Sequence, residues 1–194
     1  MEHEKWVIAD THFFHDNTWK KFKRDDGSPL RHFSSNQEMH DYMLSAWNSV
    51  VGVNDYVYHL GDVTFYYGKT FNELMSQLKG KKRLILGNHD KIKGTNLLDW
   101  FEKVELWKGF ADKDVKDCGF TMSHIPLMLN SLRDGAFNIH GHMHQNIMKD
   151  PHYINACVEL WDYTPIHFDT LFEIIRDRKK DLDNRAKIDR NLNR

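Results

Sequence analysis

Cysteine is scarce in this sequence, and long apolar runs are missing. The 194 residues include two cysteines, Cys118 and Cys157, which form no Cys-x-x-Cys pair. Buried thiols in a reducing compartment are the ordinary interpretation of such cysteines, which argues against a disulfide-rich secreted protein. No apolar run approaches membrane-spanning length, and residues 1–5 lack a signal-peptide pattern. We therefore expect a cytoplasmic protein with no membrane partner.

A net charge of one sign is also missing. Lys and Arg total 27 and Asp and Glu total 28, so the formal net charge is −1. This balance argues against whole-protein electrostatic binding of long nucleic acid, although a local basic patch stays possible. The length suits one domain over residues 1–194, with a loop-plus-helix insertion at 13–50 and a charged tail at 176–194.

What the sequence does contain is histidine, 13 in all, and one polar stretch that follows an apolar run. Leu84, Ile85 and Leu86 are followed by Gly87 and then by Asn-His-Asp at 88–90. A buried strand stopped by Gly and followed by polar residues is typical of an active-site loop at a strand end, although the same residues also form ordinary turns. The functional interpretation gains weight because the arrangement recurs.

Apolar patterns predict the elements around these stretches. Residues 6–9, 56–60, 83–86, 120–123, 137–139 and 153–160 are expected to form strands, and 104–107 a weak one. Ser35, with Glu38 three residues later, predicts the start of a helix. Its apolar face is expected to carry Met39, Tyr42, Met43, Ala46, Trp47 and Val50. A second helix is expected at 69–78 and a short one at 96–101, while 13–33 forms a long loop.

Five of the predicted strands end in residues that can bind a metal ion. These residues are Asp10, His12, Asp62, Asn88, His89, His124, His142 and His144. Strand ends in an α/β sheet meet in one crevice, so residues far apart in the sequence can meet. Mixed nitrogen and oxygen ligands suit Mn, Fe, Co, Ni or Zn. The ligands are too many for one ion, and a pair about 3.5–4 Å apart would attract a phosphate.

In order and spacing these blocks resemble the calcineurin-like metallophosphoesterases, in particular the small prokaryotic and phage-type members. The blocks are Asp10-x-His12, Gly61-Asp62, Gly87-Asn88-His89-Asp90, His124 and Gly141-His142-x-His144, over residues 10–144. The resemblance implies an α/β (α+β) fold, a four-layer β-sandwich flanked by helices, with a dinuclear metal site at strand ends. The fourth block departs mildly, because Ile125-Pro126 follows His124.

Roles for the residues follow from the resemblance alone. It implies that Asp62 bridges two ions, that His89 assists the leaving oxygen, and that Asp90 orients His89. The implied ligands of the first ion are Asp10, His12 and His144. Those of the second ion are Asn88, His124 and His142. Mn is the expected metal, with Ni, Co, Fe and Zn as alternatives.

The expected function is hydrolysis of phosphodiesters, and of monoesters as a second class, by attack of a metal-bridging hydroxide on a small or nucleotide-type substrate. A nuclease is the enzymatic alternative, and a non-catalytic scaffold with this fold is the alternative from another class. His15, Asn17 and Arg31, in the long loop after His12, are candidate substrate contacts. The tail at 176–194 carries eight Lys or Arg and four Asp, or 8 − 4 = +4. It is expected to be a solvated helical end, with an anion-binding patch as the alternative.

Overall fold

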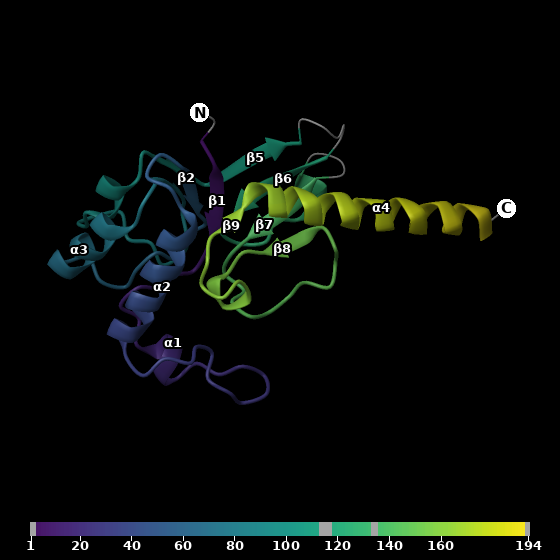
Figure 1. Ribbon diagram of the computed structural model, residues 1–194. Coiled ribbons are helices and arrows are strands. Elements are labelled where there is room, and N and C mark those ends of the chain that lie inside the picture. Colours follow the sequence, from purple (N-terminus) through teal and green to yellow (C-terminus); the bar gives the residue numbers. More distant parts are fainter. Residues whose placement is uncertain (1–2, 113–117, 133–135, 193–194) are drawn as a thin grey trace.

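The computed structural model describes residues 3–112, 118–132 and 136–192, and it contains two β-sheets flanked by helices (Figure 1). The first sheet has the strand order β4-β3-β2-β1-β9 and the second the order β5-β6-β7-β8. The first sheet consists of β1 (Lys5–Ile8), β2 (Tyr56–His59), β3 (Lys81–Ile85), β4 (Lys103–Glu105) and β9 (Ile166–His167). The second consists of β5 (Trp107–Ala111), β6 (Gly119–Ser123), β7 (Phe137–His140) and β8 (Tyr153–Asn155). The expected mixed fold of two sheets flanked by helices is confirmed.

Strand direction places the polar loops. Strands β1, β2, β3 and β4 run parallel to one another, and only the edge strand β9 is antiparallel. In the second sheet β6, β7 and β8 are parallel, while β5 pairs antiparallel with β6. Parallel neighbours end at the same edge, so the loops after β1, β2 and β3 emerge together, as do those after β6 and β7.

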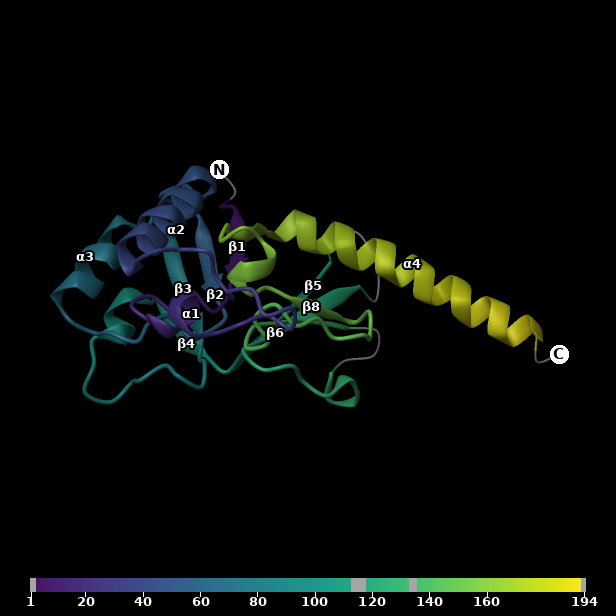
Figure 2. The same cartoon turned by 90° about the horizontal axis from the view of Figure 1, so that it is seen from below.

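Two helices cover one face of the first sheet (Figures 1 and 2). Helix α2 (Asn36–Val50) starts as predicted, since the Ser35 side chain accepts a hydrogen bond from the Glu38 N–H. Its Met39, Met43 and Trp47 are buried, whereas Tyr42, expected in the core, is exposed and donates a hydrogen bond to Asp162. Helix α3 (Lys69–Gln77) buries Phe71, Leu74 and Met75 in the same cluster.

A second apolar cluster lies between the sheets. Side chains of β1, β2, β6 and β7 contribute to it, and so does the first part of helix α4 (Phe168–Leu192). Leu171 and Ile175 of α4 are fully buried there. Each sheet therefore packs one face into a common core, which fixes the two sets of strand ends relative to each other.

Two predicted strands end differently in the structure. The expected strand at 104–107 is two strands, because the chain leaves the first sheet after β4 and enters the second at β5. The expected strand at 153–160 stops at Asn155, and Val158–Leu160 forms the 3-10 turn η3. The Cys157 N–H is bound by the Asn155 side chain, and the Val158 N–H donates to Ala9, so the segment turns from β8 towards β1.

The C-terminal tail continues α4 and points away from the sheets in both views (Figures 1 and 2). Arg176 pairs with Asp112, and Arg178 donates to the Pro151 and Tyr153 carbonyls, so these contacts attach the first half of the helix to the second sheet. No helix of the described residues is long and apolar enough to cross a membrane.

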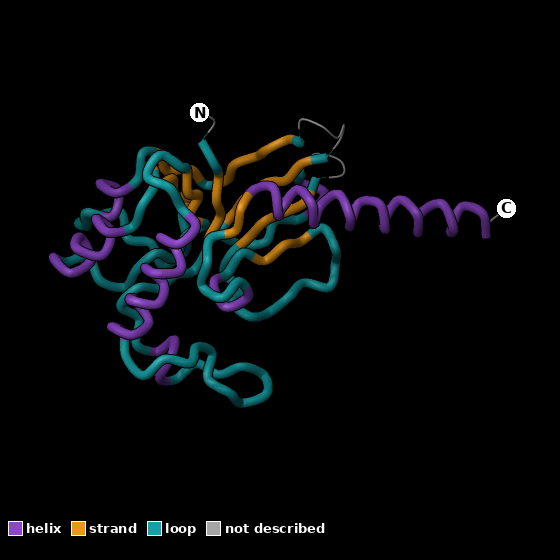
Figure 3. Tube along the Cα trace, viewed as in Figure 1, coloured by secondary structure: helices purple, strands orange, loops and turns teal. Residues whose placement is uncertain are grey.

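The long loop after β1 contains one short helix, α1 (Asn17–Lys20), and otherwise runs without regular structure (Figure 3). It is anchored at both ends. The Phe14 N–H donates to Nε2 of buried His40 on α2, and Arg31 is fully buried at the far end. The remaining 3-10 turns are η1 (Leu97–Trp100) and η2 (Leu129–Ser131).

Candidate metal centre

The candidate ligands follow five strands, β1, β2, β3, β6 and β7, and hydrogen bonds join the loops of the two sheets. Nδ1 of His124, after β6, lies 2.8 Å from the Leu60 carbonyl oxygen, after β2. The His142 N–H, after β7, donates to Oδ2 of Asp10, after β1, over 2.8 Å. The strand ends of both sheets therefore form one site.

Backbone strain concentrates at this site. Five candidate ligands have positive φ angles: Asp10 (58°), His12 (48°), Asp62 (56°), His142 (67°) and His144 (47°). Non-glycine residues rarely adopt this region, and each instance costs about 1–3 kcal/mol. The packing of the surrounding structure therefore has to compensate for this cost at the five candidate ligands.

Two glycines permit the close approach of these loops. A Cβ on Gly61, whose φ is +92°, would clash with the Gly87 backbone, and a Cβ on Gly141 would clash with the Asp10 carboxylate. Any side chain there would push apart the loops that carry Asp62, Asn88 and His142. The glycines of the predicted blocks thus serve loop packing.

Three residues form a group that we call the first half-site: Asp10, His12 and His144. One ligand atom from each lies within 4.8 Å of the others. His12 Nε2 is 3.5 Å from Asp10 Oδ1, and both side chains are buried. Burial alone would raise the pKa of Asp10, but the adjacent His12 ring and the nearby His124 and His144 hold it far below the usual range.

A buried ion pair that the sequence did not reveal braces the first half-site. Oε1 of Glu159 lies 3.0 Å from His144 Nδ1 and 2.7 Å from Arg31 Nη2, and both partners of that ion pair are fully buried. Burial alone would raise the pKa of Glu159, but Arg31 and His144 lower it to about 2. A carboxylate on Nδ1 fixes the imidazole tautomer and directs Nε2 outward, as metal-binding histidines require. No local pattern around Glu159 indicated this role.

A second half-site lies beside the first and consists of Asn88, His124 and His142. The Asn88 Oδ1 atom lies 2.7 Å from His124 Nε2 and 2.9 Å from His142 Nδ1. His124 is buried, whereas Asn88 and His142 are exposed. One amide oxygen and two imidazole nitrogens therefore converge on one point.

Asp62 lies between the two half-sites. Its Oδ2 is 3.7 Å from His12 Nε2 on one side and 3.5 Å from His124 Nε2 on the other. Its Oδ1 accepts a hydrogen bond from the His89 N–H over 2.8 Å, which holds the carboxylate in place. Burial raises the pKa of this carboxyl group. Asp62 Oδ2 therefore approaches one histidine of each half-site.

The donor set fits divalent metal ions. Asp10 Oδ1 and both ring nitrogens of His12 are buried and lack a hydrogen-bond partner within the described residues. Buried polar atoms without partners are costly, so such a cluster is expected to bind a ligand. The oxygen and imidazole donors, with no thiolate among them, match borderline divalent ions. Asp10, Asp62 and His124 form a further group that could hold a metal.

His89 and Asp90 lie beside the half-sites but differ in what they contact. The His89 ring is exposed, with its centroid 6.0 Å from that of His12. The Asp90 carboxylate accepts hydrogen bonds from the N–H groups of Asp62, Val63 and Gly87 at 3.0, 2.9 and 2.8 Å. Within the described part of the chain it has no hydrogen bond with the His89 ring. Asp90 thus ties the loops after β2 and β3 together, and the expectation that it orients His89 is corrected.

The three candidate substrate residues of the long loop separate in the structure. His15 lies at the site, with its ring centroid 5.5 Å from that of His12, and burial lowers its pKa to about 4. Asn17 begins α1, and its backbone carbonyl accepts hydrogen bonds from Lys21 and Phe22. Arg31 was expected to contact substrate, but it is buried and donates to the Asp10 and Thr11 carbonyls as well as to Glu159. That expectation is corrected, since the guanidinium faces the protein interior.

Two other histidines support the ligand loops from inside. His59 is buried, lies 2.9 Å from Thr11 Oγ1 and accepts a hydrogen bond from the Gly61 N–H, and burial lowers its pKa to about 3. His140 is buried with Nδ1 2.8 Å from the Gly141 carbonyl oxygen, and burial lowers its pKa. Burial thus disfavours the charged form of both rings.

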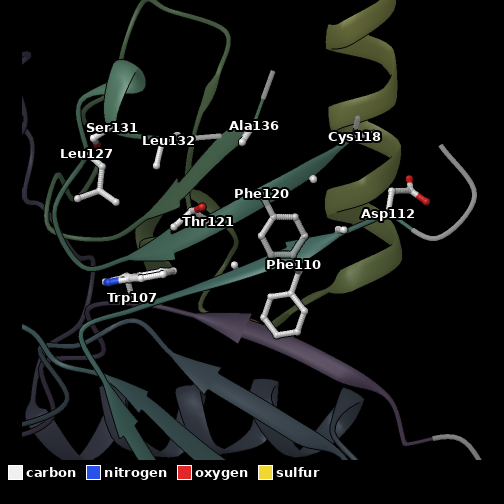
Figure 4. Close-up of a pocket in the computed structure, with 13 residues that line it drawn as sticks. Trp107, Phe110, Asp112, Cys118, Phe120, Thr121, Leu127, Ser131, Leu132 and Ala136 are labelled. Atoms are coloured by element: carbon white, nitrogen blue, oxygen red, sulfur yellow. The ribbon is translucent and has the colours of Figure 1, made fainter. Parts of the chain in front are cut away.

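A cavity of about 900 Å³ lies elsewhere (Figure 4). It is bordered by β5, β6 and the segment around η2, where Trp107, Thr121 and Leu132 point into it while Phe110 and Phe120 point away toward β1. None of the candidate ligands lines it. Cavity size therefore does not identify the site, whereas the convergence of polar strand ends does.

Comparison with known proteins agrees with this geometry. The family model for calcineurin-like phosphoesterases matches residues 5–187. The chain is 31% identical to the uncharacterized protein MJ1445 of Methanocaldococcus jannaschii, over 90% of this chain and 92% of that protein. It is 29% identical to the gene 66 protein of Mycobacterium phage L5, over 80% and 86%.

A solved structure shares the fold as well. The protein of unknown function AQ665 from Aquifex aeolicus superposes with a TM-score of 0.69 at 26% identity, covering 89% of this chain and all of that one. Together with the family match over nearly the whole length, this likeness agrees with the two-sheet architecture. The chain belongs to the calcineurin-like phosphoesterase family, and this membership supports a metal-dependent hydrolase that acts on phosphoester bonds.

Proposed function

We propose that this protein hydrolyses phosphodiesters of small, nucleotide-type substrates with two divalent metal ions, Mn²⁺ being the preferred one. The observation that carries the proposal is the position of Asp62, whose Oδ2 lies within 3.7 Å of a histidine of each half-site. One carboxylate placed between two ligand groups suits a pair of ions better than a single ion.

Bound divalent ions would lower the pKa of a water molecule and neutralise the charge on the phosphate oxygens. The residues of the chain do the remaining work. Asp10, His12 and His144 would hold one ion and Asn88, His124 and His142 the other, while Glu159 keeps His144 in the binding tautomer. The exposed His89 ring is free to donate a proton to the departing oxygen.

The role of His89 supports a diester as substrate. An alkoxide is a poor leaving group, so it gains most from a proton donor in the transition state. The loops around the site carry the glycines and strained ligands described above, and they leave Asn88, His89 and His142 open to solvent. A phosphate can therefore approach the site from that side.

The test is a metal and substrate panel. After chelation, the protein should hydrolyse bis(4-nitrophenyl) phosphate when Mn²⁺, Ni²⁺ or Co²⁺ is restored, and less well with Mg²⁺, which prefers oxygen ligands. Turnover of 4-nitrophenyl phosphate should be slower. Full activity in excess chelator, after time for metal loss, would refute the proposal, and a preference for long DNA or RNA would favour a nuclease.

A further inference from the structure

Three aromatic side chains border the candidate metal centre, and we call them the aromatic rim: His15, Phe22 and Phe65. The rings of His15 and Phe65 stack with centroids 3.9 Å apart at an angle of 18°. Phe22 meets His15 edge to face at 5.5 Å. Phe22 and Phe65 are 40% and 39% exposed, so large apolar rings face solvent here.

The aromatic rim lies directly beside His12 and His89, two residues of the site. The Phe65 centroid lies 5.3 Å from that of the ligand His12 and 5.1 Å from that of His89. A substrate whose phosphate lies between the half-sites would thus have one of its ester groups near these rings. No other described side chain contacts both His12 and His89 through a ring.

The backbone holds Phe65 in this exposed place. Its N–H donates to the Phe13 carbonyl over 2.9 Å, and Thr64 pairs with Phe13 in a parallel bridge. The Thr64 hydroxyl donates to the carbonyl of Tyr66 and accepts a hydrogen bond from the Tyr66 N–H, which closes the turn on both sides of Phe65. An exposed ring in a fixed position is a preorganised contact surface, because little ordering remains to be done on binding.

We propose that the aromatic rim is a stacking subsite for the nucleobase, or another planar aromatic group, of the phosphodiester substrate. The inference rests on the proposed function and adds the side chains that would contact the base. Stacking on an aromatic side chain tolerates any base, and Phe22 and Phe65 offer exposed aromatic surface, so discrimination among the four bases should be weak. The subsite would select nucleotide esters over plain alkyl esters.

The experiment compares two esters that share one leaving group, the 4-nitrophenyl ester of thymidine 5′-phosphate and methyl 4-nitrophenyl phosphate. The Mn²⁺-loaded protein should have the lower KM for the thymidine ester. Phe65→Leu keeps an apolar side chain but removes the ring face. It should raise that KM about 5- to 100-fold, the range for loss of one stacking contact, and should lower the ratio of the two kcat/KM values. Phe65→Trp should restore the preference.

The matched control is Tyr66→Ala. Tyr66 is 48% exposed and adjacent in sequence, but its ring contacts Phe14 rather than the site. That variant should keep the wild-type ratio. The subsite is refuted if Phe65→Leu keeps the ratio of the two kcat/KM values within twofold of the wild-type ratio. It is also refuted if the substitution lowers kcat/KM equally for both esters. In either case Phe65 only packs against His12. In the case of an equal loss, the metal content of each variant shows whether the substitution has disturbed the metal site.

Calorimetric binding of thymidine 5′-phosphate separates this inference from the proposed function. If wild-type protein hydrolyses neither ester but binds the nucleotide, and Phe65→Leu weakens that binding at least fivefold, the subsite stands and the proposed reaction fails. Equal binding by wild type and Phe65→Leu, or no measurable binding by either, refutes the subsite whatever the turnover.

Discussion

The two half-sites contain similar ligands in different surroundings. In the first, Asp10 and His12 are buried, and Glu159 holds His144 through Nδ1. In the second, only His124 is buried, and the exposed Asn88 and His142 meet through hydrogen bonds within the half-site itself. The protein interior thus fixes one group of ligands, while the other group forms the open side.

This difference indicates separate roles for the two half-sites in binding metal and admitting substrate. A buried and braced ligand set keeps its geometry before any ion arrives, so binding costs little further ordering. An exposed set can adjust, and it faces the solvent from which a phosphate must come. We therefore expect the first half-site to hold its ion more tightly than the second, which stepwise metal titration can measure.

The largest effect should follow from removing the carboxylate that both half-sites share. In Asp62→Ala, both ions would lose a ligand and turnover should fall to background, because a single oxygen of Asp62 lies within 3.7 Å of both His12 and His124. Elemental analysis should find well under two metal ions per chain. Two tightly held ions in this variant would refute the shared ligand and leave two independent sites.

The next largest effect concerns His89, which lies beside both half-sites without belonging to either. His89→Ala should keep its metal content and lose about 10²- to 10⁴-fold in turnover, the usual range for a general acid. The loss should shrink for 4-nitrophenyl esters compared with alkyl esters, since nitrophenolate needs little protonation. Equal losses for all esters together with loss of metal would instead make His89 a ligand.

An intermediate effect is expected when the contact between Glu159 and His144 is weakened. Glu159→Gln should weaken metal binding at the first half-site about 10- to 100-fold, the range for losing a carboxylate that orients a ligand histidine. The second half-site should change little. Asp150→Asn is the matched control, because Asp150 Oδ1 lies 2.8 Å from Nδ1 of His152 on the surface, away from the ligands. Equal metal affinity in both variants would show that Glu159 does not strengthen metal binding at the first half-site.

The smallest effect concerns the long loop after β1, which contains Arg31, the partner of Glu159. Burial lowers the pKa of His40 from 6.5 to about 4, and its Nε2 accepts the Phe14 N–H. Below pH 6.5 the unfolded chain therefore binds a proton on His40 that the folded chain does not, so stability falls as the pH drops from 6.5 toward 4.

His40→Gln, which keeps an acceptor for Phe14, should remove about 1–2 kcal/mol of this acid-dependent loss; the figure is below the full linkage value because solvent screens part of the shift. Urea unfolding of both proteins at pH 7 and pH 4.5 measures it. Parallel pH curves would mean that His40 does not contribute.

The metal-competent blocks were predicted from sequence because each is local. A short apolar run predicts a strand, a glycine ends it, and polar residues follow, so the ends of β1, β2, β3, β6 and β7 could be placed from their own neighbourhoods. The start of α2 at Ser35 was equally local and is confirmed. The strand expected at 153–160 was wrong because its end is decided by the hydrogen bond from the Val158 N–H to the Ala9 carbonyl, far away in the chain.

The sequence by itself therefore determined which residues can bind metal and which strands deliver them. Only the tertiary structure decided what each side chain faces. Arg31 and Glu159 are 128 positions apart, and burying either charge is tolerable only when the other meets it, so no local pattern could reveal the pair. The same holds for Asp90, which contacts backbone amides instead of His89, and for Phe65, which remains exposed because the backbone of Phe13 holds it at the site.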